Sequence, residues 1–268
     1  MATIAIARLT IANGLRQPIT WLSTGVAFAL LLLCMLFGMF TFMNQDRMSL
    51  LMTAGIAVSL LNGLFLGVVT ASDAVHDELA SRTALTLFAK PMGRGSFLVG
   101  KALGVWVVVV VSSTVIASLH LAIVYLVSRL GFDFYESGGS HAGHDHGEGV
   151  VEWLPWGRLV AGHLLAVVNA GVMTCLAASL ALRLPLVANI LCCFALFVLA
   201  HVLAGTGHAT SVAGLVPALA LFTVDDSLHF EDMRLDVGYF LLCLTYAALY
   251  ACGALAIGLA CFKRQDIP

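Results

Sequence analysis

The apolar residues of this 268-residue chain fall into six long runs separated by polar segments. A helix needs about 20 apolar residues to cross the hydrocarbon core of a bilayer, and each run is close to or above that length. The predicted spans cover Trp21–Met43, Ser49–Ala71, Ala102–Val127, Leu159–Leu180, Leu186–Leu203 and Val237–Cys261. The pattern predicts an all-α integral membrane protein, with six transmembrane helices in a single transmembrane domain over residues 1–268.

The composition supports the same class of protein. Of the residues, 60% are hydrophobic and 10% are charged, whereas a soluble domain carries about 25% charge. All seven cysteines lie in apolar runs, which is typical of small hydrophobic side chains rather than of a disulfide framework. The chain shows no Ser–His–Asp or catalytic carboxylate arrangement, so we expect no enzyme activity, and we expect the bilayer rather than nucleic acid as a partner.

The orientation follows from the distribution of Lys and Arg, which gather on the cytoplasmic side of membrane proteins. With the N-terminus inside, nine basic residues lie in the inner segments and four in the outer ones. We therefore expect a multi-pass protein of the inner (cytoplasmic) membrane with both termini in the cytoplasm.

Four segments are predicted to lie outside the spans. Residues 1–17 mix apolar residues with Arg8 and Arg16, which indicates an interfacial helix. Residues 72–101 form the largest inner segment and predict a helix followed by a turn at Pro91. Residues 128–156 form a polar outer loop, and residues 204–236 form an outer segment whose apolar part is too short to span and is interpreted as re-entrant or interfacial.

The stretch "GSFLVGKA", from Gly95 to Ala102, comes within one residue of a phosphate-binding loop. A working loop has Ser or Thr where Ala102 stands, follows a buried strand and opens a helix in a soluble sheet domain. None of these three conditions is met here. We therefore expect Gly100 to allow close helix packing and Lys101 to anchor the inner end of the span at the lipid headgroups.

The inner segment "DAVHDELASRTALTLFAKPMGRGSFLVGKALG" resembles the corresponding loop of ABC-2-type transporter permeases. Their pattern is an acidic residue, a Thr, an apolar helix, "KP", an Arg and "GK" entering the next span. The matching residues here are Glu78, Thr83, Lys90, Pro91, Arg94, Gly100 and Lys101. The closing "ACGALAIGLACFKRQDIP" is similar to the end of such permeases, and the resemblance covers nearly the whole chain.

The resemblance implies a permease that pairs with a second copy of itself and with two separate ABC ATPase subunits. A short cytoplasmic coupling helix, at about residues 73–89 here, would transmit nucleotide-driven closure to the spans. The expected ATPase-coupling residues are Asp73, Asp77, Glu78, Arg82, Thr83, Lys90 and Arg94. The alternative interpretation is that these charges only solvate a cytoplasmic loop.

The histidines of the outer loop suggest that it binds a metal. His141, His144 and His146 cluster in the outer loop, and neutral imidazole is a good ligand for copper or zinc. The alternatives are a polar loop without a metal and a loop that senses pH, and we expect no other cofactor on this chain.

Inside the spans, His120, His163 and His201 fall in the outer halves of their helices, where ionisable groups often mark a pathway. Met35, Met39 and Met43 recur every four residues and either join that pathway as soft copper ligands or simply fill the packing.

The first functional hypothesis is therefore the membrane-spanning subunit of an ABC-2-type exporter. A second hypothesis is a subunit that relays ATPase strokes to an outer partner, or handles copper, during maturation of an extracytoplasmic metalloenzyme. The chain is similar in size and layout to the permease of nitrous oxide reductase maturation, which is associated with copper handling. A third is a metal carrier that works without an ATPase.

Overall fold

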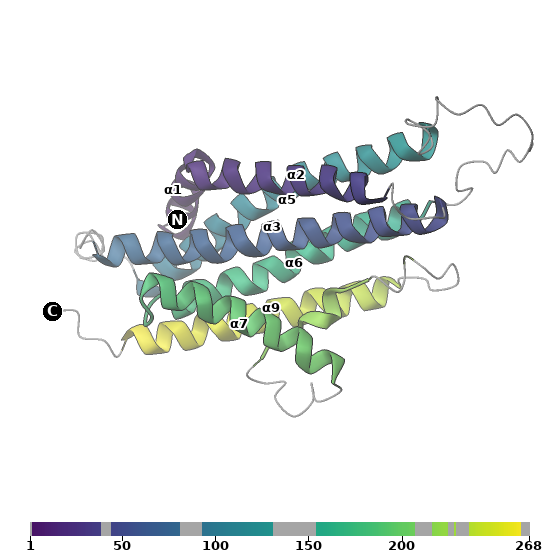
Figure 1. Cartoon of the computed structure of the whole chain (residues 1–268). Helices are drawn as coiled ribbons and strands as arrows, with labels where there is room; N and C mark the ends of the chain where they lie inside the picture. Colours follow the sequence, from purple (N-terminus) through teal and green to yellow (C-terminus); the bar gives the residue numbers. More distant parts are fainter. Residues whose placement is uncertain are drawn as a thin grey trace, which may run out of the picture.

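The computed structural model describes residues 2–38, 44–80, 93–130, 154–206, 216–224, 228 and 236–263, and these ranges contain helices and no strand. Most of the helices run side by side in an elongated bundle (Figure 1). In chain order the elements are α1 (Ala2–Arg16), α2 (Pro18–Gly38), α3 (Asn44–Ala80), α5 (Arg94–Leu130), α6 (Trp156–Leu180), α7 (Leu186–Gly205), the 3₁₀ helix η3 (Leu219–Phe222) and α9 (Val237–Lys263).

Six of these helices are long and apolar enough to cross a membrane, which confirms the predicted number of spans. The last one, Val237–Cys261, has the predicted bounds, but two others are much longer than predicted. Helices α3 and α5 each contain 37 residues, about 55 Å at the usual helical rise. Their polar ends therefore extend beyond the hydrocarbon, and the apolar runs mark only the middle of each helix.

Helices α3, α5 and α6 form the centre of the bundle, and α3 contacts α2, α5, α6 and α7. Close approach of α3 to its neighbours depends on small residues. A Cβ built on Gly63 would lie 3.0 Å from the Ala170 Cβ of α6 and 3.3 Å from the Ser113 Oγ of α5. Helices α7 and α9 lie at the edge and leave large apolar side chains exposed, among them Leu191 and Leu249.

Helix α1 runs across the bundle, near the end where α9 finishes (Figure 1). The chain bends at Gln17, and Pro18 begins α2, where its missing N–H costs nothing. Helix α1 contacts α5 at Gly100 and Gly104. A Cβ built on Gly100 would lie 2.9 Å from the Thr3 carbonyl oxygen, and a Cβ built on Gly104 would lie 2.6 Å from the Thr10 Cβ. The predicted role of Gly100 in close packing is confirmed.

The inner segment differs from the prediction. Asp73–Ala80 is the unbroken continuation of α3, and Arg94–Lys101 forms the first turns of α5. The expected separate helix therefore does not start at Asp73. The reason is that residues 72–80 contain no Pro or Gly, so nothing in the sequence interrupts the helix there. Residues 81–92 lie outside the described part of the chain.

The described part of the outer segment, residues 216–224, folds back onto the bundle. Leu219 and Phe222 are buried, and η3 contacts α6 and α7. The Ala218 N–H donates to the Tyr246 hydroxyl of α9 at 2.7 Å, and the Tyr239 hydroxyl donates to the Leu221 carbonyl. Irregular backbone at this position is thus satisfied by protein groups, as a re-entrant segment requires.

Candidate functional site

Among the buried and half-buried polar side chains of the described bundle, two groups join several helices. In hydrocarbon every unsatisfied polar group costs free energy, so polar side chains inside a span mark either a specific interhelical contact or a functional site. One group lies between α3, α5 and α6, and the other joins α1, α3 and α5 where α3 ends and α5 begins.

The first group contains two histidines in direct contact. His120 of α5 is fully buried and His163 of α6 is 4% exposed. The His120 Nδ1 lies 2.8 Å from the His163 Nε2, and the His120 Nε2 lies 3.1 Å from the Leu51 carbonyl oxygen of α3. The structure therefore brings together two of the three histidines predicted to share a pathway.

The Leu51 carbonyl determines which nitrogens of the neutral pair carry hydrogen. A carbonyl oxygen only accepts, so the His120 Nε2 must donate, and its Nδ1 is then an acceptor. The His163 Nε2 must donate to that acceptor, which leaves the His163 Nδ1 with a bare lone pair. This Nδ1 is buried, and no described protein group bonds to it.

Gly55 provides the space for the His120 ring. A Cβ built on Gly55 would lie 2.0 Å from the His120 Nε2, closer than any two such atoms can approach. Only glycine at this position lets the imidazole reach the α3 backbone.

Two serines continue the polar surface along α3 and α5. Ser59 stands one helical turn from both Gly55 and Gly63, and Ser113 faces Gly63. Both serines are 1% exposed, and neither hydroxyl has a hydrogen-bond partner in the described structure. We call His120, His163, Ser59 and Ser113 the polar seam.

The other predicted pathway residues do not join the seam through any contact that the structure describes. The His201 Nδ1 donates to the Phe197 carbonyl on its own helix α7, and its ring lies against the Phe197 ring at a tilt of 45°. Met35 packs against an apolar cluster that includes Met48 and Met52, as the packing interpretation expects. Met39, Met43, His141, His144 and His146 lie outside the described residues.

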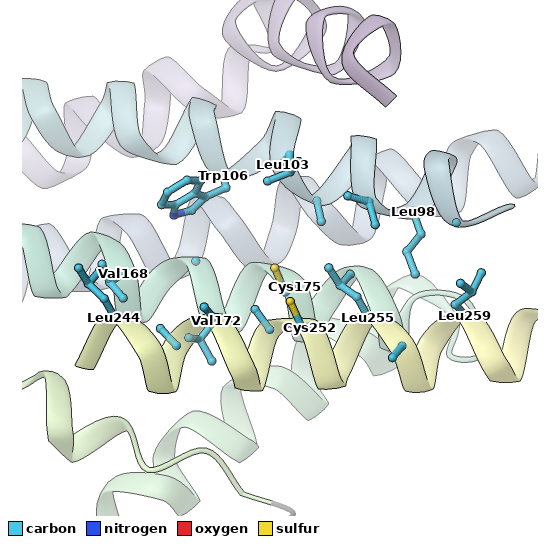
Figure 2. Close-up of a pocket in the computed structure, with 18 residues that line it drawn as sticks. Leu98, Leu103, Trp106, Val168, Val172, Cys175, Leu244, Cys252, Leu255 and Leu259 are labelled. Atoms are coloured by element: carbon cyan, nitrogen blue, oxygen red, sulfur yellow. The ribbon is translucent and has the colours of Figure 1, made fainter. Parts of the chain in front are cut away.

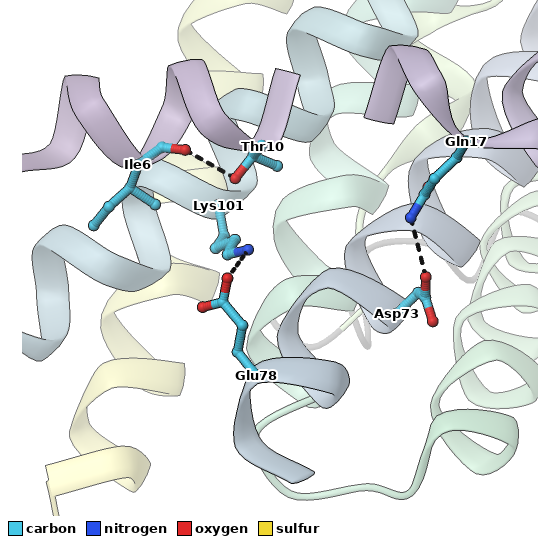
Figure 3. Close-up of polar contacts among 6 residues, drawn as sticks. All are labelled: Ile6, Thr10, Gln17, Asp73, Glu78 and Lys101. Carbon is cyan, nitrogen blue, oxygen red and sulfur yellow. Dashed lines mark hydrogen bonds and ion pairs between the residues drawn. The ribbon is translucent and has the colours of Figure 1, made fainter. Parts of the chain in front are cut away.

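The second group, which we call the inner junction, consists of two side-chain pairs (Figure 3). The Gln17 Nε2 donates to the Asp73 Oδ2 at 3.3 Å, which ties the α1–α2 bend to α3. The Lys101 Nζ of α5 forms an ion pair with the Glu78 Oε1 of α3, and the two side chains are 7% and 22% exposed. Helices α1, α3 and α5 are thereby linked at one end of the bundle.

The inner junction also bears on the role expected for Lys101. Its side chain is buried and paired with Glu78, a contact that the prediction did not include. The structure also argues against a phosphate-binding loop at residues 95–102. These residues are helical, and the Lys101 amino group is paired with Glu78.

The predicted ATPase-coupling residues are only partly described. Asp73 and Glu78 bond within the chain, and Asp77 is exposed. Arg94 is the first residue of α5. Arg82, Thr83 and Lys90 lie outside the described ranges.

Sequence reasoning missed two further polar contacts, both made by asparagines. Asn62 of α3 accepts from Ser23 of α2 and donates to Ser112 of α5, at 2.7 and 2.9 Å. Asn189 of α7 donates to Ser72 of α3 at 2.8 Å. The signal was present, because an amide inside an apolar run must find a partner on another helix.

An apolar groove of about 620 Å³ opens between α5, α6 and α9 (Figure 2). Leu103 and Trp106 line it from α5, Cys175 from α6, and Cys252 and Leu255 from α9. The lining is almost wholly apolar, so the groove offers contact area to hydrocarbon but no group that selects a hydrophilic substrate.

No protein-family model matches the sequence, and no curated protein matches it. The resemblance to ABC-2-type permeases therefore stays a prediction.

Proposed function

We propose that the chain is the membrane-spanning subunit of an ABC-type transporter, and that two copies work with two separate ATPase subunits. In this proposal the protein lies in the inner membrane with both termini in the cytoplasm, and it carries no ATPase activity of its own. The observation that carries the proposal is the inner junction, which lies where the resemblance expects an ATPase to dock.

The inner junction suits the transmission of force. Helix α3 ends at Ala80 and α5 begins at Arg94, so the intervening segment is attached to both central helices. A displacement of that segment acts on α3 and α5 together, because the Glu78–Lys101 ion pair holds them as a unit. The contacts of Gly100 and Gly104 pass the same displacement to α1.

The exposed surfaces also fit a membrane-embedded dimer. Peripheral helices α2, α7 and α9 present apolar side chains such as Trp21, Val187 and Leu241. Such surfaces suit lipid and a second copy of the chain. The exposed face of α1 combines Ile4 and Leu9 with Arg8, the composition of a helix that lies at the inner interface.

The test is co-purification of the tagged chain with a candidate ABC ATPase, sought first among the genes that neighbour its own. We expect ATP hydrolysis from the complex and none from the purified chain alone. Reversing the exposed charge with Asp77→Arg should reduce the amount of ATPase recovered, since charges at the rim of an interface determine partner selection and association rate.

A matched control separates docking from folding. Glu78→Arg alone would place two positive charges together at the inner junction and disturb the fold. The double exchange Glu78→Lys with Lys101→Glu keeps the ion pair, so the ATPase should still be recovered. ATP hydrolysis by the chain alone, or full ATPase recovery by Asp77→Arg, would contradict the proposal or its docking site, respectively.

A further inference from the structure

The polar seam contains more hydrogen-bonding capacity than the described protein groups satisfy. The His163 Nδ1, the Ser59 Oγ and the Ser113 Oγ are all buried and have no partner in the part of the chain that the structure describes. Asn169 of α6 is fully buried, and neither of its amide atoms has a partner either. Buried polar atoms are almost always paired with protein groups or with ordered water.

The unpaired atoms fall at successive levels of one interface. Gly55 backs the His120 ring, Ser59 is the next turn of α3, and Gly63 after it faces Ser113. Each turn advances by about 6 Å along the axis, so the seam runs for about 12 Å from the histidine pair to Ser113. Asn169 is at the Ser113 level, because its neighbour Ala170 lies against Gly63.

The chemistry of these atoms selects the ligand. The His163 Nδ1 is an obligatory acceptor, while the serine hydroxyls and the Asn169 amide both donate and accept. The seam has no Lys or Arg for an anion and no carboxylate for a hard cation. In the described residues no three His, Cys, Asp or Glu side chains gather in a metal-binding group. The remaining class of ligand is a small neutral molecule that both donates and accepts hydrogen bonds, and water fits this description.

We propose that the polar seam is hydrated, with internal water donating to the His163 Nδ1 and bridging Ser59, Ser113 and Asn169. The hydrated path lies between α3, α5 and α6, and the mostly apolar sequences of α3 and α5 do not reveal it. Water at this position satisfies the one nitrogen of the histidine pair that the protein leaves bare. The inference does not depend on the proposed transport function.

Solid-state NMR of the full-length chain in liposomes tests the proposal. Six of the nine histidines are replaced by Gln, which leaves His120, His163 and His201 for ¹⁵N labelling. We expect His120 and His163 to carry hydrogen on Nε2, and His201 to carry it on Nδ1, because that atom donates to Phe197. Magnetisation transferred from water should reach the His163 Nδ1 sooner than the His120 Nδ1, which the protein already occupies.

Two outcomes overturn the proposal: hydrogen on the His163 Nδ1 of the neutral ring, or no transfer from water to that atom. Replacing both serines, with Ser59→Val and Ser113→Val, should abolish the water signal at His163 and leave the His201 signal unchanged. The measurement on the chain with intact serines decides the question even if this double variant does not fold.

Discussion

Gly55→Ala is the smallest change that tests the geometry of the histidine pair. The added Cβ would lie 2.0, 2.1 and 2.4 Å from the His120 Nε2, Cδ2 and Cε1. Non-bonded carbon atoms sit comfortably at about 3.5–4.0 Å, so the ring must move by about 1.5 Å or more. That movement breaks the hydrogen bonds to the Leu51 carbonyl and to His163.

The size of the effect follows from three contributions. An interhelical hydrogen bond in a membrane protein contributes about 0.6 kcal/mol on average, and two are lost. Overpacking a filled interior costs about 1–3 kcal/mol. Alanine regains about 0.5–1 kcal/mol in a helix relative to glycine. The variant should therefore lose about 1–4 kcal/mol in free energy of unfolding.

Unfolding in mixed micelles with increasing SDS, followed by circular dichroism, measures this loss. Gly25→Ala is the matched control, because a Cβ on Gly25 of α2 meets nothing within 4 Å. In the His120→Ala background, Gly55→Ala should cost nothing, since the ring that it displaces is absent. Equal stability of Gly55→Ala and the unmodified chain, or an undiminished cost in the His120→Ala background, would refute the geometry.

Two further predictions concern the inner junction and α1. Lys101→Met should cost about 3–5 kcal/mol in the same unfolding assay, because it leaves a mostly buried carboxylate unpaired, whereas Lys101→Met with Glu78→Met should restore most of the stability. A double variant as unstable as the single one would show that the ion pair is not the cause. Gly104→Leu should detach α1, because even a Cβ would lie 2.6 Å from the Thr10 Cβ, and trypsin should then cut faster at Arg8. Gly253→Leu, at an open position, is the control for that digestion, and an unchanged cutting rate for Gly104→Leu would contradict the α1 contact.

The predicted spans were correct in number because the bilayer imposes its thickness on the sequence. Six apolar runs of sufficient length predict six transmembrane helices, and the Val237–Cys261 span has the predicted bounds. The same reasoning missed how far α3 extends. The apolar run ends at Ala71, but the hydrogen-bonded helix continues to Ala80, where no Pro or Gly interrupts it and where Asp73 and Glu78 bond to other parts of the chain.

The candidate site was only half visible in the sequence. His120 and His163 were singled out because ionisable groups are rare inside a span, and the structure places them in contact. Ser59 and Ser113 drew no notice, since a serine in an apolar run is common and costs little when it bonds to its own backbone. Their importance comes from lacking that bond, which only the packed interface reveals.

The sequence by itself determined the class of protein and the positions of the spans. The reason is that the hydrocarbon of the bilayer favours apolar residues in every span alike, so their pattern along the chain locates the spans. Which polar side chains meet depends on the rotation and depth of each helix relative to the others. Those are determined by close contacts such as Gly55 with His120 and Gly104 with Thr10, which join residues far apart in the sequence. Lys101 shows the difference: the sequence marked it as a basic residue at the end of a span, and only the packing of α3 against α5 revealed that it pairs with Glu78.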